Sequence, residues 1–265
     1  ETENVFERCY AAQMIGSGEP PYGLRPSDPG SDFGHEGSGF WFRGPLNRIR
    51  DSYAANVSAG AFAWVGIKTG KKTIPAYKGA DPSENGSSVE MNFQAVREAR
   101  RLIGHSSEDA LLIWEVGSTT QSQVRVETGE SVFEVTGWNL KRSVVQSRHL
   151  DHHHYHVVGR APLTRNTMAG VEFRHRLASR VTVEPDITGA DVGVQAPILT
   201  NTPGTSDSAP FRIVGGRLRN VRNVVVETLN QGVGTPKLDV RTLPPRRVEI
   251  LGTDLRPQNH PVGGY

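Results

Sequence analysis

The sequence predicts an all-β protein built as a β-sandwich. Turn-forming residues are abundant, with 29 Gly and 17 Pro among 265 residues. Between them lie about ten short runs rich in β-branched and aromatic residues. Apolar residues make up 36% of the chain, below the usual share for a globular protein. Many short strands separated by turns favour a sandwich or jelly roll over a helix bundle.

The first 39 residues are expected to form an extended N-terminal arm. A short helix is predicted over Val5–Met14, and clusters of Gly, Ser and Pro follow it as far as Gly39. Such clusters disfavour regular structure and are typical of surface segments. No linker divides the remainder, so we expect one domain over residues 40–265.

One longer helix is predicted over Val89–Ile103. Ser87 and Glu90 have the spacing of a capping box, and Gly104 follows where a helix C-cap prefers glycine. Strands are predicted for most of what surrounds it, and no internal repeat at a solenoid period is found. The predicted strands are Ala61–Ile67, Leu111–Val116, Gln123–Glu127, Ser131–Val135, Tyr155–Val158, Val171–Phe173, Arg180–Glu184, Val224–Thr228, Leu238–Arg241 and Val248–Leu251.

Charge and cysteine content exclude several classes of function. The chain has 30 Lys+Arg against 28 Asp+Glu, a formal net charge of +2, which argues against a dedicated nucleic-acid binder. Cys9 is the only cysteine, so an internal disulfide framework and a multi-cysteine zinc site are both excluded. No apolar run approaches the ~20 residues that a membrane-spanning helix needs, and no membrane span is expected.

The run Asp151–His156 contains four histidines. On a strand, His152, His154 and His156 share one face, and three imidazoles on one face are a candidate zinc site. No acidic residue that would complete the ligand set stands at a cupin-like spacing, since the next acidic residue along the chain is Glu172. Two other interpretations stay open: a solvated loop, and a pH-responsive subunit contact made by His152, His153, His154 and His156.

Other chemical motifs are weak, and no catalytic residue or cofactor is predicted. The chain has no Gly-x-Ser-x-Gly elbow and no phosphate-binding loop. Arg217, Arg219 and Arg222 are interpreted as solvated charges on a strand edge. The four tryptophans are expected in the core, although on a carbohydrate-binding sandwich they would form a stacking platform; they are Trp41, Trp64, Trp114 and Trp138.

Three segments resemble picorna-like virus capsid proteins of the iflavirus and dicistrovirus type: Phe40–Arg50, Asn56–Val65 and Gly129–Trp138. Thr136 stands where that family favours Pro, and the Asp-Asp-Phe motif of maturation cleavage is missing. The resemblance implies an eight-stranded jelly roll with long loops and one or two short helices. A start at Glu1 rather than Met suits release from a polyprotein.

The function expected from this resemblance is structural and not enzymatic. The chain would be a capsid protein that assembles with sister subunits into an icosahedral shell, in the virion and, during assembly, in the host cytoplasm. Its low net charge implies weak contact with genomic RNA. Two alternatives remain: a metal-dependent cupin-like enzyme using His152, His154 and His156, and a carbohydrate-binding β-sandwich.

Overall fold

The computed structural model describes an all-β chain, which confirms the predicted class. No helix long and apolar enough to cross a membrane occurs among the residues described. Those residues are 4–16, 36–65, 71–73, 88–90, 95–114, 116, 130–148, 151–160, 169–173, 179–197, 211–228 and 248–257.

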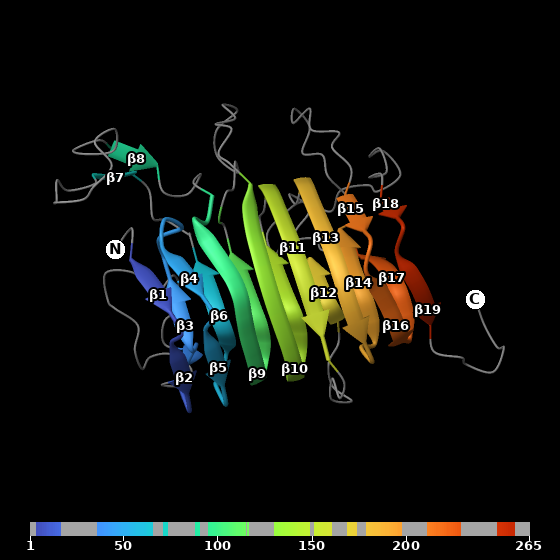
Figure 1. Ribbon diagram of the computed structural model, residues 1–265, viewed down its shortest axis with the longest axis horizontal. Coiled ribbons are helices and arrows are strands. Elements are labelled where there is room, and N and C mark those ends of the chain that lie inside the picture. Colours follow the sequence, from blue (N-terminus) through green and yellow to red (C-terminus); the bar gives the residue numbers. More distant parts are fainter. Residues whose placement is uncertain are drawn as a thin grey trace, which may run out of the picture.

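Seventeen of the strands form one continuous sheet in which every pairing is parallel (Figure 1). The chain lays each strand beside the equivalent strand of the preceding turn, so that three stacks of strands develop along the molecule. Among the described residues, the short strands β7 (Lys71–Thr73) and β8 (Ser88–Glu90) are the only ones that pair antiparallel, and they form a separate ribbon.

The first stack carries the site described below. It runs through β1 (Val5–Glu7), β4 (Arg48–Arg50), the start of β9 (Glu98–Trp114), the start of β10 (Ser131–Arg148), β11 (Asp151–Gly159), β13 (Ser179–Thr188), β15 (Phe211–Val214) and β18 (Val248–Leu251).

The other two stacks complete each turn. The second contains β2 (Tyr10–Ala12), β5 (Tyr53–Ala55), β16 (Arg217–Val221) and β19 (Asp254–Pro257). In this stack β16 pairs with the end of β13. The third contains β3 (Phe40–Phe42), β6 (Gly60–Val65), the ends of β9 and β10, β12 (Ala169–Phe173), β14 (Val192–Pro197) and β17 (Asn223–Thr228).

This topology is a parallel β-solenoid, and the predicted jelly roll is not confirmed. A jelly roll joins antiparallel strands through Greek-key connections, whereas the main sheet here is parallel throughout. Successive turns begin at residues 5, 48, 98, 131, 151, 179, 211 and 248. The interval is 50 residues between 48 and 98 but 20 between 131 and 151, so the turns have no fixed period that a search for repeats would detect.

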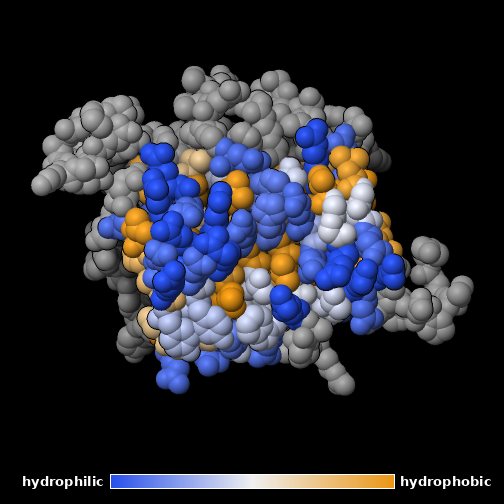
Figure 2. All heavy atoms as spheres, viewed as in Figure 1, coloured by the Kyte–Doolittle hydropathy of each residue, from blue (hydrophilic) through white to orange (hydrophobic). Residues whose placement is uncertain are grey.

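The core lies inside the solenoid and consists of rows of side chains in register. One row of the first stack joins Ile49, Ala99, Phe133, Tyr155 and Val183. The side chains of this row are all fully buried. The residues between them in the strands point outward, as period-two alternation requires. The face shown in Figure 2 is accordingly hydrophilic over most of the strands, with smaller hydrophobic areas between.

The predicted helix over Val89–Ile103 is wrong, because β9 begins at Glu98. Within this segment a β-bulge gives the apolar residues Ala99 and Leu102 a spacing like that of a helix face. Arg101 has a positive φ of 51°. Ala99 lies opposite Phe133 of β10, and Leu102 lies opposite Val135. Three residue steps on β9 therefore match two on β10, as in a β-bulge. Two inward residues therefore stand three apart, as on a helix face.

Part of the predicted N-terminal arm belongs to the sheet. The short helix predicted over Val5–Met14 is absent; β1 and β2 occupy this segment and pair with β4 and β5. Residues 17–35 of the predicted arm lie outside the described residues, as do the predicted strands at 123–127 and 238–241.

Candidate metal centre

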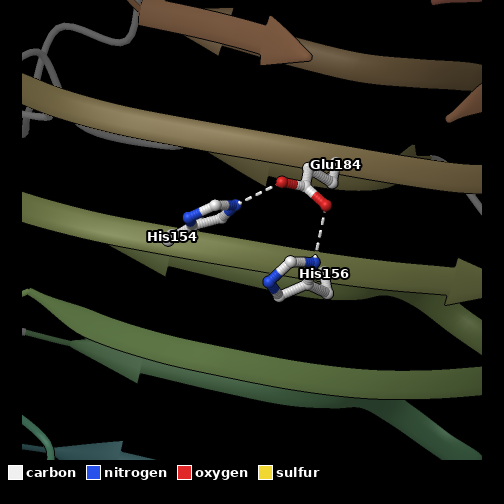
Figure 3. A group of neighbouring side chains, drawn as sticks. All are labelled: His154, His156 and Glu184. Atoms are coloured by element: carbon white, nitrogen blue, oxygen red, sulfur yellow. Dashed lines mark hydrogen bonds and ion pairs between the residues drawn. The ribbon is translucent and has the colours of Figure 1, made fainter. Parts of the chain in front are cut away.

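Two neighbouring strands of the first stack bring His154, His156 and Glu184 together on the outer face of the solenoid (Figure 3). His154 lies opposite Thr182, and His156 lies opposite Glu184. Because both histidines occupy outward positions of β11, flanking the buried Tyr155, their rings lie on the same side of the strand. The Glu184 side chain reaches between them from β13.

The three side chains are in direct contact. Nε2 of His154 lies 2.9 Å from Oε1 of Glu184, and Nδ1 of His156 lies 2.8 Å from Oε2. The two imidazole rings stack with their centroids 4.5 Å apart and 20° between their planes. The side chains are 21%, 39% and 38% exposed in the order His154, His156, Glu184, so the cluster is open to solvent on one side.

The donor set fits a divalent transition metal. One ligand atom from each residue lies within 4.8 Å of the other two. At metal–ligand distances near 2.1 Å, tetrahedral geometry separates two ligand atoms by roughly 3.4 Å, so small side-chain rotations suffice to enclose an ion. Two imidazoles and one carboxylate are ligands that Zn²⁺ and Fe²⁺ accept, and they leave coordination positions open.

Two further acidic residues belong to the segment beside the cluster, one directly before β10 and one within it. Oε1 of Glu130 lies 3.9 Å from Nδ1 of His154, on the side of the ring that faces away from Glu184. Glu134 of β10 is the register partner of His156. Carboxylates beside the second nitrogen of a ligating histidine orient the ring and make it more basic, so Glu130 is placed to fix His154.

The histidine run splits between two faces. His153 points inward; it is 0% exposed, and its Nδ1 lies 3.0 Å from the hydroxyl of Tyr155. It cannot belong to an outward contact with His154 and His156, which corrects that part of the pH-responsive contact predicted for all four histidines. The side chain of His152 lies outside the described residues. Of the three histidines predicted to form a metal site, the structure therefore places His154 and His156 in the cluster.

The carboxylate that joins the two histidines in the candidate ligand set belongs to Glu184, which the sequence alone does not single out. Glu172 is instead 4% exposed in β12 of the third stack, where its Oε2 accepts a hydrogen bond of 3.3 Å from Gln146. Glu184 could have been found only from the register of β11 on β13, because it lies on the next turn of the solenoid.

The tryptophans give little support to a sugar platform. Trp64 is buried in the core, as expected, whereas Trp41 of β3 is only half-buried. The side chain of Trp114 lies outside the described residues. Trp138 joins an outer row of rings, where it stacks on His105 with centroids 4.6 Å apart and 19° between planes. The face of Trp138 that stacks on His105 is covered and is not available to a sugar.

The same row continues through Tyr53, whose hydroxyl contacts the His105 ring, and Tyr10, which stacks on Tyr53 at 5.3 Å. Partial burial in this row lowers the pKa of His105. The row is therefore a packed ladder that runs along the outside of the solenoid.

The arginines predicted as solvated edge charges form ion pairs between turns. Arg217 binds Asp186, Arg219 binds Asp254 at 2.7 Å, and Arg222 lies 3.6 Å from Asp191. The hydrogen bonds that Arg217 donates to the Asp186 carboxylate raise the pKa of Arg217. These pairs join neighbouring strands and hold the outer surface of the last turns.

No family model, curated protein or solved structure matches this chain. The functional argument therefore depends on the geometry of the site.

Proposed function

We propose that this protein binds a divalent transition metal, zinc first among them, through His154, His156 and Glu184. The observation that carries the proposal is the meeting of two imidazole nitrogens and a carboxylate within 4.8 Å of one another. The ligands come from β11 and β13, which are paired over eight residues from Asp151 to Gly159. Strand pairing fixes the backbone under all three, and this favours a preformed site.

The number of ligands favours a reactive site over a structural one. Structural zinc sites usually have four protein ligands, whereas catalytic sites have three and keep one position for water. A metal bound here would acidify that water and polarise a carbonyl or phosphoryl group. We therefore propose metal-assisted chemistry on the open outer face of the solenoid, the enzymatic alternative that the sequence left open.

The capsid interpretation stays a prediction. Its structural expectation was a jelly roll, and the parallel pairing of the main sheet gives that expectation no support. The carbohydrate-binding interpretation also stays a prediction: Trp64 is buried, Trp41 is half-buried, and Trp138 stacks on His105. Neither alternative accounts for the convergence of His154, His156 and Glu184.

Direct titration of the tag-free, chelator-treated protein with zinc chloride tests the proposal. We expect one zinc per chain, and Glu184→Gln should weaken binding by at least tenfold because the neutral amide is a poorer ligand. His105→Gln is the matched control, since His105 lies in the outer ladder and contacts no member of the cluster. Equal zinc affinity in the wild type and Glu184→Gln would show that zinc is not held here.

A further inference from the structure

We propose that a second subsite beside the metal centre binds an acid group, so that the site takes a dicarboxylate with one end on the metal and the other on Arg160. This inference rests on the proposed metal site. It starts from a shallow pocket of about 380 Å³ on the outer face, lined by Val158, Gly159, Arg160, Asp186, Thr188 and Arg217.

The pocket continues the two strands that carry the metal ligands. Val158 follows His156 by two residues on β11, and Asp186 follows Glu184 by two residues on β13. Val158 and Asp186 are register partners, so they form the next outward pair along the same face. Two residues of strand advance roughly 7 Å, which places the near wall of the pocket about that far from the cluster.

The charges that line the pocket favour an anion. Asp186 is neutralised by Arg217, which holds both carboxylate oxygens through Nε and a second guanidinium nitrogen, the latter at 2.8 Å. Arg160 is exposed, and the part of the chain that the structure describes offers its side chain no hydrogen bond or ion pair. Among the described residues, the lining therefore carries one positive charge without a partner, on a guanidinium fork that can bind a carboxylate through two parallel hydrogen bonds.

Thr188 supplies a neutral hydrogen-bond donor in the same pocket. A monoanion could satisfy either the metal or Arg160, but only a ligand with two acid groups satisfies both. Arg160 follows His156 by four residues, which is roughly 13 Å of extended chain. A flexible chain of a few methylenes with an acid group at each end, as in glutarate, can lie along Val158 with one acid group toward the metal and the other toward the guanidinium. The class of ligand that we infer is therefore a linear aliphatic dicarboxylate.

The experiment measures glutarate and butyrate binding to the zinc-loaded, tag-free protein by calorimetry. Butyrate has one carboxylate and a similar aliphatic chain, so the ratio of the two affinities reports the second acid group. We expect glutarate to bind at least tenfold more tightly than butyrate. Arg160→Met should abolish that ratio, since a charge-assisted bidentate contact is worth about this much, while zinc affinity stays unchanged.

Arg48→Met is the matched control, because Arg48 is also an exposed arginine of the first stack but lies on β4, three strands from β11. It should leave the ratio unchanged. Thr188→Val provides a second, milder variant that should reduce glutarate affinity without changing the charge. An unchanged ratio in Arg160→Met with normal zinc binding would overturn the subsite alone, whereas a wild-type chain that binds no zinc would overturn both proposals.

Discussion

Replacing Phe133 by alanine should destabilise the solenoid by about 3–5 kcal/mol. The ring is 0% exposed and lies in the middle of the inward row of the first stack. It packs edge-on against Trp64 at 5.9 Å and stacks on Tyr155 at 5.2 Å, with 13° between the two planes. Truncation removes these contacts and leaves a cavity that β9 and β11, held by their own neighbours, cannot close.

Phe6→Ala is the matched control, because Phe6 belongs to the same row through Ile49 and Ala99 but has a described neighbour on one side only. It is half-buried, so its loss should cost roughly 2 kcal/mol or less. Urea unfolding followed by circular dichroism gives both free energies. Equal losses of stability in the two variants would refute the expectation that a side chain in an interior turn contributes more to stability than one in an outer turn.

Three further outcomes follow from the described contacts. Gly104→Ala should lower the free energy of unfolding by about 1–3 kcal/mol through overpacking, since a Cβ at residue 104 would lie 2.7 Å from the Cβ of Ala61 and 3.0 Å from the Cβ of Ala110. Wild-type thermal stability in this variant would contradict the inward placement of Gly104. His153→Ala should cost about 2–3 kcal/mol, and His156→Ala under about 0.5 kcal/mol without metal, so equal losses in urea would contradict the alternation of β11. A hydrogen bond from Arg101 holds the pKa of Asp51 below its ordinary 3.8, so the ionised carboxylate stabilises the fold above about pH 4, and this contribution is lost as pH falls through the folded-state pKa. Asp51→Asn should therefore lose less stability than the wild type between pH 5 and pH 3. Equal losses in the two proteins would count against the ion pair.

Local patterns in the sequence were sufficient for the class of the fold. The apolar run Ala61–Ile67 predicts a buried strand, and all six residues of β6 are buried. Ser131–Val135 and Tyr155–Val158 likewise fall inside β10 and β11. These predictions succeed because alternation and bounding turns are properties of a few adjacent residues.

The arrangement of the strands was not predictable in the same way. A parallel pair joins residues that are a whole turn apart, and the intervals between turns differ along this chain. Where a local pattern is interrupted, it can also mislead. The bulge at Arg101 gives β9 the spacing of a helix face, and Gly104, interpreted as a helix cap, instead fills a place inside the solenoid where no Cβ fits.

The candidate site shows where sequence reasoning ends. Alternation alone places His154 and His156 on one face, because both belong to one strand. The third ligand is specified by pairing: His156 lies opposite Glu184 on the following turn and opposite Glu134 on the preceding one. Those partners stand 28 and 22 residues away in the sequence (184 minus 156 and 156 minus 134). Since the turn length varies, no motif with fixed spacing describes the three ligands, and the acid that completes the site emerges only when the turns are stacked.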